Sequence, residues 1–196
     1  MSIETITLLT VFLPILGSLT IPAAGLLAKP LRSAWSVLLA AVTAILPMTL
    51  IPFALTGGEL VIRRDLFLGL DFILVVDPLS VFMAIVSSAV GCLIVIYSLG
   101  YIRHEENQNE YYLMVLLFIG SMMGLVFSAN LVFMYLFWEI IAICCWRLIG
   151  FYRVRDFVRK ADKAFLVTFF GAVVMLLGFI QIYGQTNTFD LTAMRG

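Results

Sequence analysis

Residues 111–151 read YYLMVLLFIGSMMGLVFSANLVFMYLFWEIIAICCWRLIGF, and this stretch decides the fold. A helix crosses the hydrocarbon core of a bilayer with about 20 predominantly apolar residues, so the stretch is long enough for two crossings. Its only polar break is Ser128-Ala129-Asn130, where we expect a tight turn. The stretch therefore predicts a pair of membrane-spanning helices, residues 111–129 and 130–151.

Four further segments are long and apolar enough to span a membrane, namely residues 5–28, 33–56, 78–102 and 164–184. Hydrophobic residues make up 63% of the 196 residues and charged residues 12%, and the mean hydropathy is +1.10. A soluble domain carries about 25% charged residues, and a soluble core of this size cannot bury so much apolar surface. The sequence therefore predicts an all-α membrane protein with about six transmembrane helices.

Several function classes receive no support from the composition. The formal net charge is zero, so nucleic-acid binding is not indicated. The cysteines Cys92, Cys144 and Cys145 lie in apolar runs without a CxxC or Cys/His cluster, and the only histidine, His104, has no companion at metal-ligand spacing. A haem ligand pair, a P-loop and a dinucleotide fingerprint are also missing from the sequence. We predict no metal, no cofactor and no catalytic residues.

The chain divides by its polar segments. Residues 1–56 form two lead-in helices, residues 57–77 an extracytoplasmic loop with a loose alternation that favours a hairpin, residues 78–184 four further helices and residues 185–196 an extracytoplasmic tail. Lys and Arg concentrate in loops that face the cytoplasm, so the uneven charge predicts that both termini face outward. The nine basic residues on the predicted cytoplasmic side are Lys29, Arg32, Arg103, Arg147, Arg153, Arg155, Arg159, Lys160 and Lys163.

Glu139 is the outstanding candidate for function, because it lies near the middle of the span 130–151. A charged side chain at the bilayer centre costs about 2.5–3.5 kcal/mol on insertion scales. A glutamate there is neutral, paired with a cation or hydrated in a cavity, and proton relays use these properties. The alternative is a protonated structural glutamate that bonds another helix.

Other candidate residues have weaker support. Arg147 lies about 12 Å along the same helix from Glu139, where a water chain would connect the two, or its side chain reaches the cytoplasmic headgroups. Lys163 opens the last span and either snorkels or points inward. Asp77 is suited to cap the helix that begins at Pro78, and Trp138 fits an interfacial or packing role.

Five motifs occur in order along the chain. They are Asp77-Pro-Leu-Ser, Tyr101-Ile-Arg-His-Glu-Glu, Asn130-Leu-Val-Phe-Met-Tyr-Leu-Phe-Trp-Glu139, Leu148-Ile-Gly-Phe-Tyr152 and Lys163-Ala-Phe-Leu-Val-Thr168. Together they resemble the N-terminal part of the antiporter-like membrane subunits shared by respiratory complex I, Mrp cation/proton antiporters and group 4 membrane-bound hydrogenases. The Leu-Ile-Gly-Phe-Tyr ending resembles the largest such subunit of complex I and the Mrp A subunit.

The resemblance implies a truncated antiporter-like fold in the inner (cytoplasmic) membrane. It implies that Glu139 belongs to a buried polar axis that moves protons, where the family pairs this glutamate with a lysine of the seventh helix. This sequence ends before such a lysine. It also departs from the family in two places. Thr168-Phe169-Phe170-Gly171-Ala172 stands where the complex I subunit has Thr-Arg-x-Gly-Asp, and Arg147 stands where the family usually has an apolar residue.

Two functions follow from the resemblance. The first is a split N-terminal portion of an antiporter-like subunit, which contributes to proton or Na⁺/H⁺ translocation in a multisubunit complex. Its expected partners are lipid, other membrane subunits and a chain that supplies the later helices. The second is a non-pumping structural spacer of such a complex, which the lost polar groups favour. A stand-alone small transporter is a third hypothesis, for which Glu139 alone would offer little selectivity. With either of the first two functions, the chain would be a membrane subunit of a redox-driven translocase or of an Mrp-type antiporter.

Overall fold

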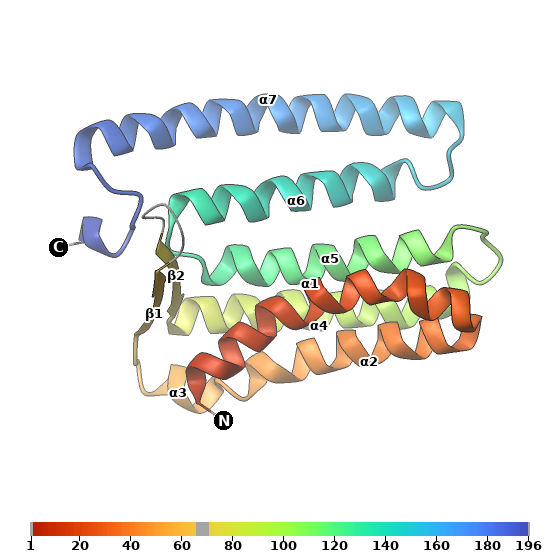
Figure 1. Cartoon of the computed structure of the whole chain (residues 1–196), viewed down its shortest axis with the longest axis horizontal. Helices are drawn as coiled ribbons and strands as arrows, with labels where there is room; N and C mark the ends of the chain where they lie inside the picture. The colour runs from red at the N-terminus through yellow and green to blue at the C-terminus, as the bar shows by residue number, and fades with distance from the viewer. Residues whose placement is uncertain (1, 66–70, 196) are drawn as a thin grey trace.

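Six long helices dominate the computed structural model, which describes residues 2–65 and 71–195 (Figure 1). They are α1 (Ile3–Leu27), α2 (Lys29–Met48), α4 (Pro78–Tyr101), α5 (Gln108–Phe127), α6 (Leu131–Ile149) and α7 (Arg155–Thr186), with the short α3 (Ile51–Leu55) continuing the span of α2. Within the described residues, these six are long and apolar enough to cross a membrane. The prediction of an all-α, six-span membrane fold is confirmed.

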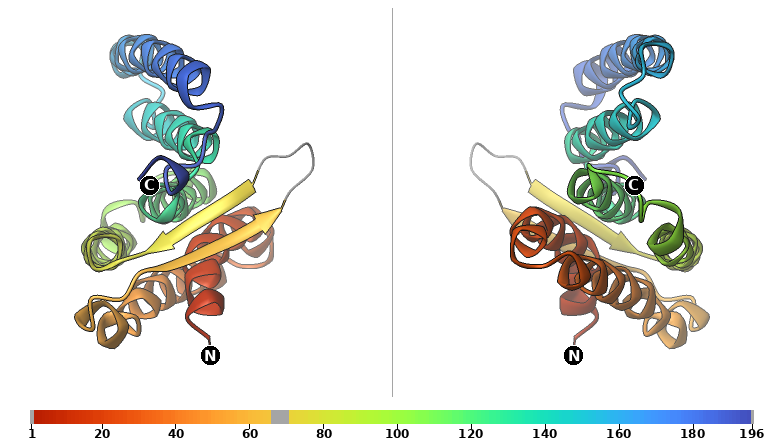
Figure 2. Two further views of the ribbon diagram at one scale, coloured as in Figure 1. Left: turned by 90° about the vertical axis from the view of Figure 1, so that its left-hand side faces the viewer. Right: turned by 90° about the vertical axis from the view of Figure 1, so that its right-hand side faces the viewer.

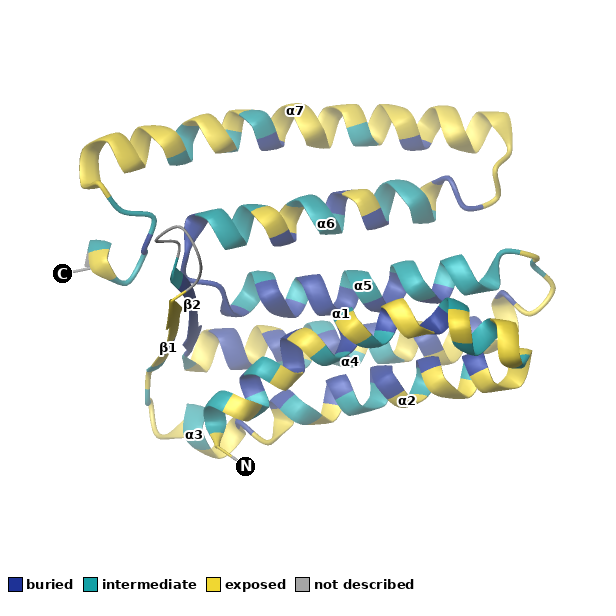
Figure 3. Cartoon of the chain, in the orientation of Figure 1, coloured by how far each residue is buried: buried dark blue, intermediate teal, exposed yellow. Residues whose placement is uncertain are grey.

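The helices form a bundle with two helices added at one side. α1 packs against α2 and α5, α2 against α4, and α4 against α5, while α6 lies on α5 and α7 lies on α6 (Figures 1 and 2). Burial falls from α5 through α6 to α7, where the buried residues are Ala161 and Ala172 (Figure 3). The remaining surface of α7 is therefore open to lipid or to further protein.

Small residues allow the closest helix contacts. A side chain built on Gly120 of α5 would lie 2.9 Å from the backbone nitrogen of Ile15 in α1 and 3.0 Å from the ring of Pro14. A side chain on Gly124 would lie 2.5 Å from the ring of Phe137 in α6. Small residues at such crossings let helix backbones approach closely in membranes, where dispersion contacts are the main attraction.

A β-hairpin crosses one end of the bundle (Figure 2). Strands β1 (Leu60–Asp65) and β2 (Asp71–Val76) pair antiparallel, with Ile62 opposite Leu74. Ile62 and Leu74 belong to the core formed with α1, α4 and α5, because directly paired residues of neighbouring strands share one face of the hairpin. The turn between α5 and α6 is hydrogen-bonded to β2, because the backbone N–H of Ala129 donates to the carbonyl of Ile73 at 2.9 Å.

The α5–α6 connection is short because α5 ends at Phe127 and α6 begins at Leu131. Asn130 caps α6 by accepting from the N–H of Val132 at 2.9 Å, and its side-chain amide donates to the carbonyl of Asp71 at 2.9 Å. The turn is thus fixed to the hairpin as well as to its own helix.

The last helix is longer than the sequence predicted. α7 begins at Arg155, not near residue 164, so four basic residues that we placed in a cytoplasmic loop belong to its first turns: Arg155, Arg159, Lys160 and Lys163. Hydropathy detects only the apolar part of a helix. The polar segment before it contains no Gly or Pro and is rich in residues with good helix propensity, so the helix begins well before the apolar part.

Candidate functional site

Glu139 lies at the middle of α6, and its carboxyl group is the centre of the candidate site. Its side chain is half-buried, and its Oε1 is fully buried without a hydrogen-bond partner among the residues that the structure describes. The hydroxyl group of Tyr135, one turn earlier on the same helix, lies near enough to interact with the carboxyl group. The site therefore combines an acidic group, one hydroxyl group and an oxygen with unused bonding capacity.

The register between α6 and α7 shows what Glu139 faces. The rings of Trp146 and Phe165 lie 5.7 Å apart, so these residues are opposite each other. Seven residues make almost two helical turns, so residues seven apart lie on the same face of a helix. Glu139 is seven residues before Trp146, and Ala172 is seven residues after Phe165. Because α6 and α7 are antiparallel, Glu139 and Ala172 are expected at the same level of the interface. Ala172 is only 2% exposed. We infer that Glu139 is directed at the α6–α7 interface, where the methyl group of Ala172 lies opposite it.

This environment restricts the protonation chemistry. A buried carboxylate needs a cation or several hydrogen-bond donors, and otherwise its neutral form is favoured. None of the ion pairs found among the described residues involves Glu139. The buried oxygen is therefore free to accept a hydrogen bond or to contact a cation that comes from outside the described residues.

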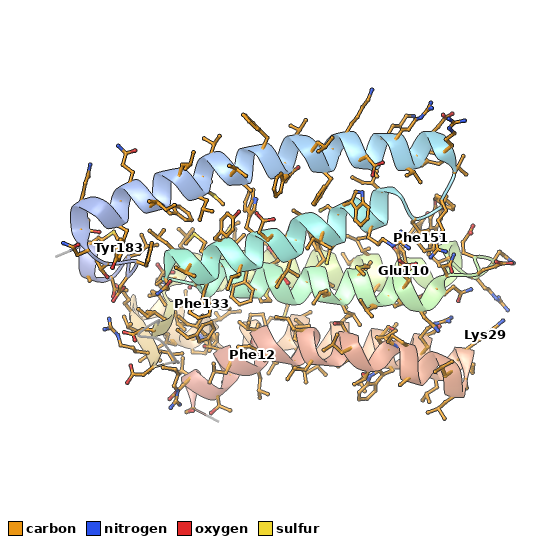
Figure 4. The ribbon with its side chains drawn as sticks, turned by 45° about the horizontal axis from the view of Figure 1, so that its top comes forward. Phe12, Lys29, Glu110, Phe133, Phe151 and Tyr183 are labelled. Carbon is orange, nitrogen blue, oxygen red and sulfur yellow. The ribbon has the colours of Figure 1, made fainter. Side chains whose placement is uncertain are left out.

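Arg147 is not the partner of Glu139. Its Nε binds one oxygen of Glu110 in the first turn of α5, and Arg153 binds the other oxygen at 2.8 Å. Figure 4 places Glu110 beside Phe151, at the end of the helices that also carries Lys29. The sequence predicts a water chain to Glu139 or a headgroup contact for Arg147, whereas in the structure Arg147 binds Glu110.

A signal for this contact was nevertheless present in the sequence. A turn at 128–130 folds two helices back on each other, so residues about equally far from the turn meet. Glu110 is 18 residues before Ser128 and Arg147 is 17 residues after Asn130. Glu110 falls just outside the predicted span 111–129, although α5 begins at Gln108 and includes it.

Lys163 is also not brought to Glu139. It is exposed, and it follows the buried Ala161 by two residues, which places it on the opposite side of α7 from α6. It lies nine residues before Ala172, about 13.5 Å along the helix. The cation for Glu139 is therefore not supplied by Lys163 in this arrangement.

Asp77 and Trp138 have separate roles. Asp77 accepts from the N–H of Ser80 at 2.7 Å, and Ser80 Oγ accepts from the N–H of Asp77 at 2.9 Å, a reciprocal cap of α4. Trp138 is 40% exposed on α6. Within the described part of the chain, no group of three His, Cys, Asp or Glu side chains is placed to hold a metal ion.

The fold and the site define a multi-span helical membrane protein with one carboxyl group in the middle of a helix–helix interface. Residues 128–195 match the family described as NADH:quinone oxidoreductase/Mrp antiporter, TM, and residues 67–112 match the family described as NADH-ubiquinone oxidoreductase (complex I), chain 5 N-terminus. The predicted resemblance to the antiporter-like membrane subunits is confirmed.

Individual relatives agree with this assignment. The chain is 32% identical over 190 residues to Na⁺/H⁺ antiporter subunit A1 of Staphylococcus aureus strains JH9 and Newman, covering 95% of this chain and 24% of each relative. A chain in the structure of the membrane-bound sulfane sulfur reductase, an archaeal respiratory membrane complex, shares its fold with a TM-score of 0.86 and 18% identity, over 94% of this chain and 38% of that one. The present chain thus spans about a quarter of the curated relatives it matches.

Proposed function

We propose that this chain is the N-terminal portion of an antiporter-like subunit and that Glu139 carries protons during translocation by a multisubunit membrane complex. The observation that carries this proposal is the carboxyl group of Glu139 at mid-helix, with one fully buried oxygen that has no partner among the described residues. An ionisable residue inside a membrane is costly, so its presence in the middle of α6 favours a functional role. The assignment of the relatives as Na⁺/H⁺ antiporter subunits supports the same role.

The proposed mechanism requires a cation that comes and goes. When a positive side chain approaches Glu139, the ionised carboxylate is stabilised and the proton leaves; when it withdraws, the neutral acid is favoured again. Neither Arg147 nor Lys163 is placed for this role. We therefore assign the cation to helices that cover the open faces of α6 and α7, supplied by a partner chain or by a continuation of this one.

The test is proton translocation by the intact complex that contains the Glu139→Gln variant. Glutamine has nearly the same shape and keeps hydrogen-bonding capacity, but it cannot release a proton. Glu106→Gln, an exposed carboxyl group in the α4–α5 loop, is the matched control. We expect translocation to be lost in the first variant and kept in the second.

A structural spacer is the second candidate, and Ala172 is the observation that favours it. The residue opposite Glu139 is an alanine, whereas the complex I subunit that this chain resembles has an aspartate at this position. The row of polar groups that would carry protons therefore lacks one carboxyl group. If the complex containing Glu139→Gln assembles and pumps at the normal rate, the spacer function is the correct one.

The partners and the orientation belong to the same proposal. We propose that the chain copurifies with other membrane subunits, including the one that supplies the later helices, and that Lys29, Arg103 and the start of α7 face the cytoplasm. Cysteines introduced singly at Asn107 and at Thr188, labelled with an impermeant thiol reagent in whole cells, test the orientation. Labelling at Thr188 alone supports it, and labelling at Asn107 alone reverses it.

A further inference from the structure

A pocket of about 430 Å³ opens where α2 begins, α4 ends and α5 begins. Three basic residues line it, Lys29, Arg32 and Arg103, and its lining contains no carboxyl group. Lys29 lies at the end of the bundle, in the same region as the α4–α5 loop (Figure 4). Positive charge is therefore concentrated at the level where the helices leave the membrane.

Arg32 is the built element of this pocket. It is only 5% exposed, and its guanidinium group lies 5.6 Å from the ring centre of Tyr112. Its Nη1 donates to Asn109 Oδ1 at 2.8 Å, and its Nη2 donates to the side-chain oxygen of Gln108. These partners fix the orientation of the guanidinium plane, but they are all neutral.

The positive charge of Arg32 is not compensated within the described part of the chain. None of the ion pairs there includes Arg32, and its Nε is fully buried without a hydrogen-bond partner. A buried charge without an opposite charge is destabilising, and each unused buried donor adds to that cost. An anion in the pocket supplies the missing opposite charge.

The surrounding structure holds the arginine in place. Gln108 donates through its amide nitrogen to the carbonyls of Arg103 at 2.9 Å and Glu105 at 2.7 Å, so the α4–α5 loop is tied to the same side chain that binds Arg32. Asn109 packs closely on α1, so that a side chain at Gly25 would meet its amide group and displace it.

The rim of the pocket is apolar. Leu99 lines it, and Leu31, Trp35 and Leu38 form an exposed face of α2 that runs from the pocket toward the middle of the membrane. Guanidinium and ammonium groups at the membrane surface bind phosphate groups, and the exposed leucines suit acyl chains. We propose that this pocket binds the phosphate headgroup of an anionic phospholipid, with Arg32 as the central ligand and Lys29 and Arg103 at the entrance.

The experiment titrates the full-length chain, purified with its copurifying subunits, and measures bound lipid by native mass spectrometry. The three ligands are dioctanoyl phosphatidylglycerol, dioctanoyl phosphatidylcholine and inorganic phosphate. The test variant is Lys29→Gln/Arg103→Gln, because both residues are exposed and their loss leaves the core intact. The control is Arg155→Gln/Arg159→Gln, which removes two exposed positive charges at the start of α7.

We expect the wild type to bind phosphatidylglycerol more tightly than phosphatidylcholine. Each cation near an anionic headgroup is worth about a fivefold change in affinity, so the test variant should bind phosphatidylglycerol about 25-fold more weakly. The control should change by less than about twofold, because its charges lie outside the pocket. Arg32→Lys, which keeps the charge but loses the planar fork, should also weaken binding.

Three results would overturn the proposal. Equal affinity for the two lipids would remove the role of the anionic headgroup. Equal losses in the test and control variants would show a general charge effect instead of a pocket. Inorganic phosphate that binds as tightly as phosphatidylglycerol would make this a site for soluble anions, because the acyl chains would then contribute nothing.

Discussion

Arg147 in the last turn of α6 binds Glu110 in the first turn of α5, and Arg153 completes the clamp from the following loop. This contact closes the open end of the α5–α6 hairpin, opposite the turn at Asn130. Arg147, which lies about 12 Å from Glu139 along α6, is therefore already paired with another carboxylate. The family departure at position 147 thus has a structural explanation that is independent of proton transfer.

Glu110→Gln should lower the stability of the hairpin. The carboxylate and Arg147 are both largely shielded, with side-chain exposures of 25% and 30%, so the loss leaves a poorly solvated cation. We expect a cost of about 1–3 kcal/mol, or roughly 2–4 °C in the unfolding midpoint for each kcal/mol. Thermal unfolding in detergent measures it.

The control for this prediction is Arg153→Gln. Arg153 is 53% exposed, and pairs of that kind contribute about 0–1 kcal/mol. A midpoint for Glu110→Gln that equals the wild-type value would show that the clamp has no role in stability.

Gly120→Ala should disrupt the crossing of α1 and α5. The new methyl group meets the backbone of Ile15, which can move only if the whole of α1 moves, and overpacking of this kind costs about 1–3 kcal/mol. Gly178→Ala is the matched control, because a side chain there meets nothing within 4 Å. Should the two variants unfold at the same temperature, the close crossing is not important for stability.

The sequence predicts the helices of this fold better than their ends. The six spans follow from apolar length alone, because a membrane leaves the backbone few alternatives. The start of α7 at Arg155 was missed because helix propensity, and not hydropathy, extends it. The contacts of residues 189–191 with the α5–α6 turn were also missed. They consist of two backbone hydrogen bonds, such as that from the Leu191 N–H to the carbonyl of Ala129, which leave no pattern in the sequence.

Asp190 should make the attachment of the C-terminal segment dependent on pH. Burial raises the pKa of Asp190, but hydrogen bonds from Thr192 and Ala193 and the charge of Arg63 outweigh it, so the pKa lies below its ordinary value. A lowered pKa means that the contribution to stability is complete above the ordinary Asp pKa of about 3.9 and is lost as pH falls through the folded-state pKa. Limited acid proteolysis of the segment should therefore accelerate only in that range.

Asp190→Asn tests the same contact at neutral pH. It should increase cleavage after residue 186 at pH 7 and remove the acid dependence, whereas Asp65→Asn, an exposed carboxyl group on β1, should change neither. Unchanged cleavage in Asp190→Asn would contradict the assignment.

The position of Glu139 opposite Ala172 can be tested by crosslinking. In a background without the three native cysteines, Glu139→Cys combined with Ala172→Cys should form a disulfide under mild oxidation, because paired positions in a helix interface bring their Cβ atoms close. Glu139→Cys with Phe170→Cys should not, since Phe170 is 71% exposed on another face of α7. Crosslinking of the second pair alone would refute the register.

The candidate site was predictable only in part. Glu139 stands out because a lone acid in an apolar helix is costly. Which side it faces depends on the register of α6 and α7, which is set by contacts such as Trp146 with Asp162 at 3.0 Å. Such contacts between helices joined by a loop are not encoded in hydropathy. For the same reason the neutral partners of Arg32 could not be anticipated from the sequence.

The central claim is that Glu139 carries protons, and the most direct measurement is proton translocation by the assembled complex with Glu139→Gln, normalised to the amount of complex. A positioned proton-transfer group contributes about 10²–10⁴ to a rate, so we predict a fall of at least about 100-fold, with Glu106→Gln unchanged. Translocation at the wild-type rate in a fully assembled Glu139→Gln complex would contradict the account and leave the chain a structural spacer.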